Sequence, residues 1–214
     1  KYDIYDIFLE KPTPLVPRER CYEVGERIAA DGSVVAPIDE ASAARVIEDI
    51  ESGAAEAVAI CLLHSYVNPD HERELAASLG ERLPDVAVSL SSDLLPEMRE
   101  YERATSTTAN AFVRPLIDGY LERLAGHARE RGIAASLFVM LSSGGISTMD
   151  VVRRFPVRIC ESGPAAGAVT AARIGDQVDA ENVLSFDMGG TTAKSCLIHD
   201  GMPAVTTEFE AARM

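Results

Sequence analysis

Apolar and polar residues along the chain alternate in blocks that predict helices and strands in turn. Around Asp31-Gly32, two short apolar runs predict a hairpin. Apolar residues then recur three and four positions apart after Asp39 and after Asn68-Pro69, which indicates two amphipathic helices. The first half is predicted to hold a hairpin, a helix, a strand, a helix and a strand, at residues 22–38, 39–53, 56–65, 68–83 and 86–90. This alternation predicts a largely parallel sheet with helices across its faces.

The second half begins with a long helical pattern, residues 97–131, which Gly132 should stop. Pro115 lies inside this segment and is expected to kink or divide it. The apolar residues that define its period are Phe112, Leu116, Tyr120 and Leu124. Shorter elements should follow: a strand at 136–141, a helix at 148–154, a strand at 157–160, a helix to about 174, strands flanking 187–192, and a tail strand at 204–209. Three prolines in residues 10–19 predict an extended arm before all of these elements.

Composition and charge narrow the class of protein. The chain has 214 residues, enough for one large or two small domains, and 47% of them are hydrophobic. Its formal net charge of -14 argues against bulk nucleic-acid binding, because phosphate backbones repel such a surface. No apolar run approaches the roughly 18 residues of a membrane span. The four cysteines form no CxxC pair and are expected to be reduced and buried in a cytoplasmic protein. The four histidines are expected at the surface or in loops.

Residues 187–192, "DMGGTT", carry the clearest candidate chemistry. They stand at the turn between two strand-like runs. Glycine allows backbone N–H groups to approach an anion, threonine hydroxyls add donors, and an acid at a strand end can hold Mg²⁺ or orient a water molecule. An ordinary glycine hairpin with a capping Asp explains the same composition equally well, so both interpretations stay open on the residues alone.

Other small or charged segments offer weaker candidates. "LSSGG" contains Gly144 and Gly145, and "ESGPAAG" places Ser162 and Gly163 at the start of a helix whose N–H groups can bind an anion. The alanines of that helix favour close packing on a sheet, and Glu161 is either an acid in a cleft or a satisfied surface charge. In the charged segment 97–111, a solvated helix face explains most of the pattern, although Arg103 and Asn110 could face a substrate.

Several stretches together resemble one family. They are "YDIFLEKPTPLVPRERCYEVGERIAADGSVVAPID", "ICLLHSYVNPDHE", "LPEMREYERATSTTANAFVRP", "MLSSGGI", "ESGPAAGAV" and "DMGGTT". In this order they resemble the hydantoinase A/5-oxoprolinase family, to which acetone carboxylase subunits also belong. The strand-"DMGGTT"-strand segment is similar to a phosphate-binding hairpin of the actin, sugar-kinase and Hsp70 ATPase superfamily. The resemblance covers nearly the whole chain.

The resemblance implies an α/β protein with a partial actin-like (ribonuclease H-like) ATPase fold, in which mixed sheets are flanked by helices. It implies an extended arm at 1–20, the remainder of a first α/β lobe at 21–93, and a helical connection with the start of a second lobe at 94–214. ATP and Mg²⁺ are the implied cofactors, with Asp187 as the catalytic and metal-binding residue. The implied phosphate contacts are Gly189, Gly190, Thr191, Thr192, Gly144, Gly145, Ser162 and Gly163, with Arg103, Asn110 and Glu161 as candidate substrate contacts.

The implied activity is ATP-dependent opening of a cyclic amide, such as a hydantoin or 5-oxoproline, through a phosphorylated amide. A second, hydantoinase B-like subunit is the implied partner. An acetone-type ketone carboxylase subunit and a non-catalytic actin-like nucleotide-binding module are the alternatives, and a plain α/β domain whose glycine turn binds nothing is a third. The sequence does not show whether the substrate is a hydantoin, 5-oxoproline or a ketone.

Two departures from the family pattern affect this expectation. Relatives carry an acid, as in "GGTSTD", where this chain has Lys194, which could reach a phosphate but which we expect to point into solvent. The family also has a first acid-x-Gly-Gly-Thr hairpin near its N-terminus, and this chain has no second copy. We therefore expect the chain to be an internal piece of a longer enzyme and to be inactive alone.

Overall fold

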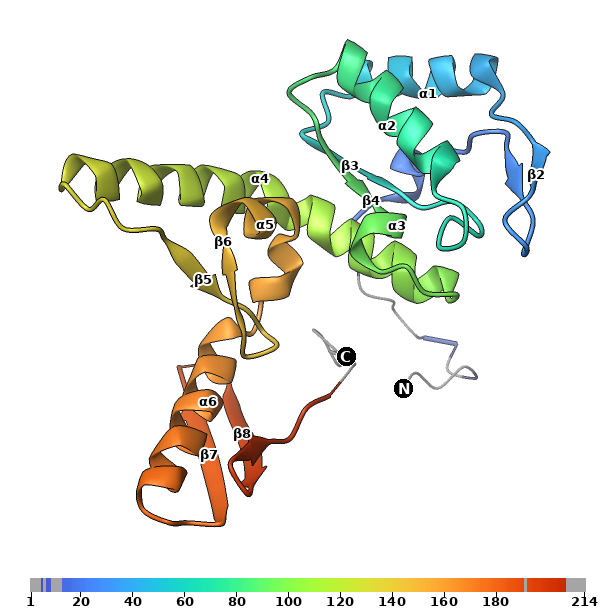
Figure 1. Ribbon diagram of the computed structural model, residues 1–214. Coiled ribbons are helices and arrows are strands. Elements are labelled where there is room, and N and C mark those ends of the chain that lie inside the picture. Colours follow the sequence, from blue (N-terminus) through green and yellow to red (C-terminus); the bar gives the residue numbers. More distant parts are fainter. Residues whose placement is uncertain (1–4, 6, 9–12, 191, 207–214) are drawn as a thin grey trace. The chain divides into compact units, whose positions relative to one another are not determined.

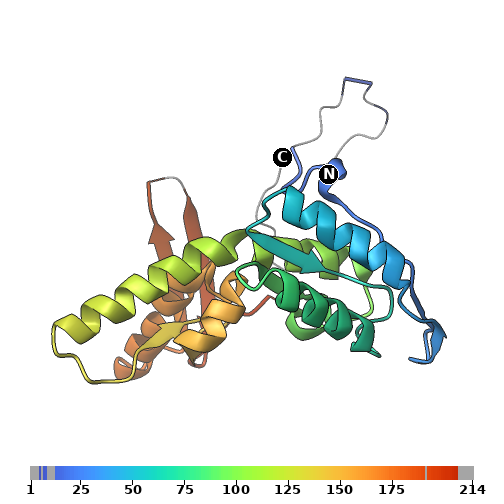
Figure 2. The same ribbon diagram turned by 90° about the horizontal axis from the view of Figure 1, so that it is seen from above.

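The computed structural model describes residues 5, 7, 8, 13–190 and 192–206, which divide into two compact units. The first unit comprises Pro14–Ala134 with Arg153–Val157. The second unit comprises Lys1–Thr13, Ala135–Val152 and Arg158–Met214. Figures 1 and 2 show the ribbon of both units. The expected division into lobes at 20 and 93 stays a prediction.

The first unit contains the predicted alternation of strands and helices. Its elements are η1 (Arg18–Arg20), β1 (Arg27–Ile28), β2 (Val34–Ala36), α1 (Glu40–Ser52), β3 (Ala57–Ile60), α2 (Asp70–Arg82), β4 (Ala87–Leu90), α3 (Ser91–Leu94) and α4 (Glu100–Glu130). The short strands β1 and β2 pair antiparallel, and Gly32 in their turn has a φ of 86°, a conformation that favours glycine. Strands β3 and β4 pair parallel, which confirms the sheet type expected from the sequence.

The core of this unit lies between α1, α2 and one face of the β3–β4 pair (Figures 1 and 2). Asp39 caps α1, because its carboxylate accepts the backbone N–H groups of Ala41 and Ser42. The buried residues of the core are Ile38, Ala43, Ile47, Ile50, Ile60, Leu75 and Leu79. Their spacing on α1 and α2 is the three-and-four period from which both helices were predicted.

The long helix α4 contacts β3 and β4, but not through the apolar row that the sequence suggests. It runs through Pro115 as one helix, so the expected division into two does not occur. The row of four apolar residues is exposed: Phe112, Leu116, Tyr120 and Leu124. The buried residues are Arg103, Thr107, Asn110, Ala111 and Leu121. Polar groups therefore supply much of the contact between this helix and its unit.

The second unit pairs helix α6 with a small antiparallel sheet (Figure 1). From Ala135 onward the elements are β5 (Phe138–Met140), β6 (Ile146–Thr148), α5 (Met149–Arg154), η2 (Pro156–Ile159), α6 (Ser162–Gln177), β7 (Asn182–Met188), β8 (Ala193–His199) and β9 (Met202–Pro203). Small residues allow α6 to lie close to β7: Ala168 and Ala172 are buried, and a Cβ on Gly175 would come within 2.7 Å of Val183 Cγ2. This is the close packing expected from the alanines of α6.

Some predicted elements of the second half differ from the structure. The sequence predicts a strand at 157–160, but Pro156–Ile159 form a 3-10 helix, because the fixed φ of proline suits the first position of a helix. The tail strand expected at 204–209 is replaced by β9 at Met202–Pro203, and residues 207–209 lie outside the described residues. The strand β6 and the short helix α3 were not predicted.

The predictions for cysteines and histidines are partly wrong. All four cysteines are free, as expected, but Cys21 and Cys160 are exposed rather than buried. His71 is buried in α2, where its Nδ1 lies 2.7 Å from Glu26 Oε2. Among the described helices, none has the length and apolar character needed to cross a membrane.

Candidate functional site

The turn between β7 and β8 is open to solvent. The two strands pair in register from Asn182 and His199 to Met188 and Ala193, so the turn lies between Met188 and Ala193. Gly189 N donates to the carbonyl of Thr192 at 3.0 Å, which closes the turn. An added Cβ on Gly190 would meet nothing within 4 Å. The side chain of Thr192 is exposed and Thr191 lies outside the described residues. This open glycine turn has the accessibility that an anion-binding backbone needs.

Asp187 stands at the end of β7, directly opposite Lys194 on β8. Directly paired residues of an antiparallel sheet share a face. Alternation places Asp187 on the same face as Val183, which contacts α6, whereas Phe186 and Met188 belong to the opposite, exposed face. Asp187 is itself exposed. The acid is therefore on the helix side of the hairpin and in contact with solvent.

Lys194 does not point freely into solvent as we expected, because its Nζ contacts Glu161 Oε2. Glu161 immediately precedes α6. Its backbone N–H donates to Ser142 Oγ at 3.0 Å, and Ser142 N donates to the carbonyl of Arg158 at 2.7 Å. These contacts connect three of the segments that the sequence marked: the loop after β5, the turn before α6, and β8. Sequence reasoning missed this ion pair, because its two residues are 33 positions apart.

The start of α6 lacks a side-chain cap among the described residues. Glu161 occupies the capping position but directs its carboxylate to Lys194. The first-turn N–H groups of a helix have no partner within the helix, so those of Ser162 and Gly163 are donors that an anion can use. Gly163 is exposed, and a Cβ on it would meet nothing within 4 Å.

Gly144 has a structural reason to be glycine. Its φ is +83°, its N–H donates to the carbonyl of Leu141 at 3.0 Å, and an added Cβ would lie 3.1 Å from Val169 Cγ2. It therefore forms the tight turn between β5 and β6 beneath α6. Gly145 is exposed beside it. Their roles as phosphate contacts stay predictions.

Arg103 and Asn110, the candidate substrate contacts on α4, are both fully buried. Arg103 donates to the hydroxyls of Ser65 and Ser91 and to the carbonyl of Leu62. Asn110 donates to Ser89 Oγ at 3.0 Å and to the carbonyl of Arg154 at 3.1 Å. Their side chains hold the first unit together, and their proposed contact with a substrate stays a prediction.

The residues at the turn suit a nucleotide-bound Mg²⁺ ion. Mg²⁺ prefers oxygen ligands and commonly takes one or two carboxylates, with phosphates and waters as the remaining ligands. Asp187 offers one exposed carboxylate beside the glycine turn. Within the described residues, the group of three potential metal ligands is Glu181, His199 and Asp200, which are all exposed and do not include Asp187. Asp187 would thus hold a cation together with the phosphates, not within a protein cage.

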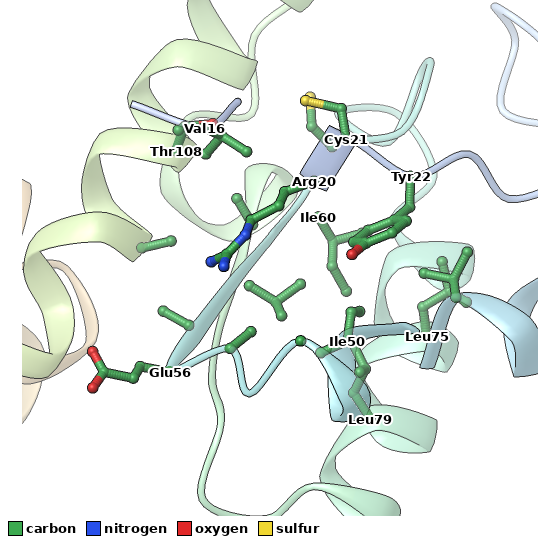
Figure 3. Close-up of a pocket in the computed structure, with 18 of the residues that line it drawn as sticks. Val16, Arg20, Cys21, Tyr22, Ile50, Glu56, Ile60, Leu75, Leu79 and Thr108 are labelled. Atoms are coloured by element: carbon green, nitrogen blue, oxygen red, sulfur yellow. The ribbon is translucent and has the colours of Figure 1, made fainter. Parts of the chain in front are cut away.

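A separate pocket of about 640 Å³ lies in the first unit (Figure 3). Its walls come from residues 15–24, α1, α2, β3 and α4, and they are largely aliphatic. Figure 3 shows Arg20 and Tyr22 reaching into it from the segment before β1. None of the residues predicted to bind phosphate or metal lines this pocket.

Comparison with known proteins agrees with the resemblance seen in the sequence. The model of the family described as "Hydantoinase/oxoprolinase" matches residues 103–214, and that of the "Hydantoinase/oxoprolinase N-terminal region" matches residues 1–83. An uncharacterised protein of Methanocaldococcus jannaschii is 40% identical over 207 residues, which are 97% of this chain and 30% of that protein.

Two relatives with solved structures share the fold of this segment. The caprolactamase subunit alpha of Pseudomonas jessenii is 34% identical over 188 residues, 88% of this chain and 27% of that protein. The crystal structure of this ATP-dependent caprolactamase matches with a TM-score of 0.81 over 90% of this chain and 28% of that chain. A nucleotide-free structure of acetone carboxylase, an enzyme of ATP-dependent acetone carboxylation, matches at 28% identity with a TM-score of 0.77 over 90% of this chain and 27% of that chain. The chain thus spans less than a third of the length of these relatives, and it belongs to the hydantoinase/oxoprolinase family.

Proposed function

We propose that the protein, in its full natural length, is an ATP-dependent hydrolase that opens a cyclic amide ring. The observation that carries this proposal is the open turn at Gly189 and Gly190 beside the exposed carboxylate of Asp187. Family membership and the likeness to an ATP-dependent caprolactamase support it, since caprolactam is itself a cyclic amide. The described residues form part of an actin-like nucleotide-binding fold in this proposal.

The chemistry requires activation of an amide, which is a poor electrophile. Transfer of the γ-phosphoryl group of ATP to the amide oxygen, with loss of the N–H proton, turns that oxygen into a leaving group. Water then adds to the same carbon, and cleavage of the C–N bond, with protonation of the nitrogen, opens the ring and leaves an acyl phosphate. A second water molecule hydrolyses the acyl phosphate and releases inorganic phosphate. The products are ADP, inorganic phosphate and a ring-opened amino acid.

The residues of this chain would act mainly by positioning and by balancing charge, as phosphoryl transfer requires. The N–H group of Gly190 would bind a phosphate oxygen, and Gly189, whose own N–H donates to Thr192, would let the phosphate approach the backbone closely. The hydroxyls of Thr191 and Thr192 would be further donors. The first-turn N–H groups of Ser162 and Gly163 would add a second set of donors. Asp187 would hold Mg²⁺, which neutralises phosphate charge when bound.

A ketone carboxylase subunit is the second candidate, because the acetone carboxylase structure matches almost as well as that of the caprolactamase. There the same phosphoryl transfer would activate a substrate for carbon–carbon bond formation. In both cases a second subunit of the hydantoinase B type is the proposed partner, consistent with the description of the caprolactamase relative as a subunit.

The test uses the full-length protein with its candidate partner subunit. Phosphate release is followed with ATP and a panel of cyclic amides (a hydantoin, 5-oxoproline, caprolactam), and in parallel with a ketone and bicarbonate. Ring-opened product from one cyclic amide supports the hydrolase, and carboxylated product supports the second candidate. Nucleotide binding without either product indicates a non-catalytic module and contradicts both.

The variant Asp187→Ala tests the role of this carboxylate in ATP turnover. The proposal expects a loss of ATP turnover of about 100-fold or more with an unchanged melting temperature, by analogy with the loss of one electrostatic group at an active site. Wild-type turnover in Asp187→Ala would remove Asp187 from the mechanism.

A further inference from the structure

The pairing of β7 with β8 places a carboxylate and an ammonium group opposite each other. Asp187 and Lys194 are opposite each other in register. Cβ atoms of such pairs lie about 4.5–5.5 Å apart, so the ammonium of a lysine can readily reach an aspartate across the ladder. An ion pair between them would occupy the carboxylate that the proposed function assigns to a metal.

The structure shows a different partner for the lysine. Lys194 Nζ contacts Glu161 Oε2 at the start of α6. With the residues that the structure describes, the carboxylate of Asp187 makes no hydrogen bond and no ion pair. The two side chains of the pair are partly shielded, with 37% of Lys194 and 25% of Glu161 exposed.

We propose that Glu161 is a positioning residue: it holds the ammonium of Lys194 away from Asp187 and so keeps that carboxylate available for a divalent cation. The inference rests on the proposed function, in which Asp187 binds the metal. A carboxylate paired with an ammonium is a poorer ligand, because binding of the cation must first displace the lysine.

The position of Glu161 suits this role. Its backbone N–H is fixed by Ser142 Oγ at 3.0 Å. Its carboxylate lies at the N-terminal end of α6, where the helix dipole stabilises negative charge. Glutamine at this position would keep the size of the side chain but would lose the charge that attracts Lys194. The ammonium would then find its nearest alternative partner at Asp187.

The experiment measures metal binding directly, in the full-length protein with a non-hydrolysable ATP analogue. Free Mn²⁺ is followed by electron paramagnetic resonance as a substitute for Mg²⁺. Glu161→Gln should weaken Mn²⁺ binding about fivefold, the scale of one unit charge a few ångströms away in a solvated site. The double variant Glu161→Gln/Lys194→Met should restore wild-type binding. Asp150→Asn, which removes an exposed charge in α5 of the same unit, is the control and should leave binding unchanged.

If the ion pair of Glu161 and Lys194 only tethers β8 to α6, the Mn²⁺ affinities of the variants should follow a different pattern. Both single variants would then weaken binding, and the double variant would not recover. Lys194→Met alone decides between the two even if Glu161→Gln fails to fold: the proposal expects Mn²⁺ affinity equal to or tighter than wild type, and weaker binding overturns it. Absence of nucleotide-dependent Mn²⁺ binding in the wild-type protein would instead contradict the proposed function itself.

Discussion

Glu72 and Arg103 carry opposite charges, are both fully buried, and share the hydroxyl of Ser91. Ser91 Oγ donates to Glu72 Oε1 at 2.6 Å and accepts from Arg103 Nη1 at 3.1 Å. Glu72 also accepts the backbone N–H groups of Leu62 and Ser92, each at 2.9 Å. One charged network therefore fixes the loop that follows β3 and the helix α3 that follows β4.

Removal of one charge from this network should be costly. We expect Arg103→Met to lower the free energy of unfolding by about 3–5 kcal/mol, because Glu72 would remain buried without its counter-charge. Urea denaturation of the full-length protein measures the change. Arg99→Met, which removes an exposed partner of Glu102, is the matched control and should cost less than about 0.5 kcal/mol. A stable Arg103→Met protein with a selectively raised KM for substrate would favour the substrate-contact role for Arg103.

Asn110 should matter for stability in a similar way. Its Nδ2 donates to the carbonyl of Arg154, and its Oδ1 accepts the N–H of Val157 at 3.2 Å. Asn110→Ala would leave these backbone groups without their partner, at a cost of about 1–3 kcal/mol. The measurement is the urea midpoint at constant slope, and an unchanged midpoint would show that the contacts contribute nothing.

Two glycines of the second unit allow a comparison of backbone strain. Gly144→Ala should destabilise the protein by about 1–2 kcal/mol, because its φ of +83° is unfavourable for a residue with a Cβ and Val169 leaves little space. Gly163→Ala, in open space at the start of α6, should be close to neutral. Thermal unfolding of the two variants tests the difference, and equal melting temperatures would contradict it.

The turn glycine Gly190 offers a test of binding without a change in fold. An added Cβ has free space there, so Gly190→Ala should retain the wild-type melting temperature. If phosphate approaches this backbone closely, the same methyl group should weaken ATP binding about tenfold or more. Calorimetric titration with a non-hydrolysable ATP analogue gives the affinity. Unchanged affinity would mean that phosphate does not approach Gly190.

Cysteine labelling can test the packing of the first unit. Burial raises the pKa of the Cys61 thiol, and a hydrogen bond with Ser91 and the charge of Arg103 oppose the shift only in part. A raised pKa means less of the reactive thiolate at any given pH. Iodoacetamide at pH 8 should therefore modify the exposed Cys21 and Cys160 well before Cys61. Mass spectrometry of timed samples measures the order, and simultaneous labelling of all three would contradict it.

The sequence was sufficient for the parts of the fold that depend on local rules. Asp39 before a three-and-four apolar period predicts α1 correctly, and Asp31-Gly32 predicts the β1–β2 hairpin. The apolar row of α4 that includes Phe112 does not indicate the buried face of that helix, for a physical reason. Spacing shows that four apolar residues share a helix face, but not whether anything covers that face.

Contacts between segments that are distant in the sequence could not be predicted from local patterns. The network around Glu72 joins residues up to 41 positions apart, the separation of Arg103 and Leu62. Nothing local distinguishes a glutamate that will be buried from one at the surface. At the candidate site, the hairpin and its acid followed from the residue pattern, whereas the partner of Lys194 depended on how α6 lies against β8.

The exposed apolar residues of α4 and of the β7–β8 sheet have a practical consequence for laboratory work. Phe112, Leu116, Leu184, Phe186 and Leu197 are each more than 60% exposed. Rows of this kind promote aggregation. A recombinant polypeptide of these 214 residues should therefore require solubilising additives, and assays on it should include light scattering as a routine check.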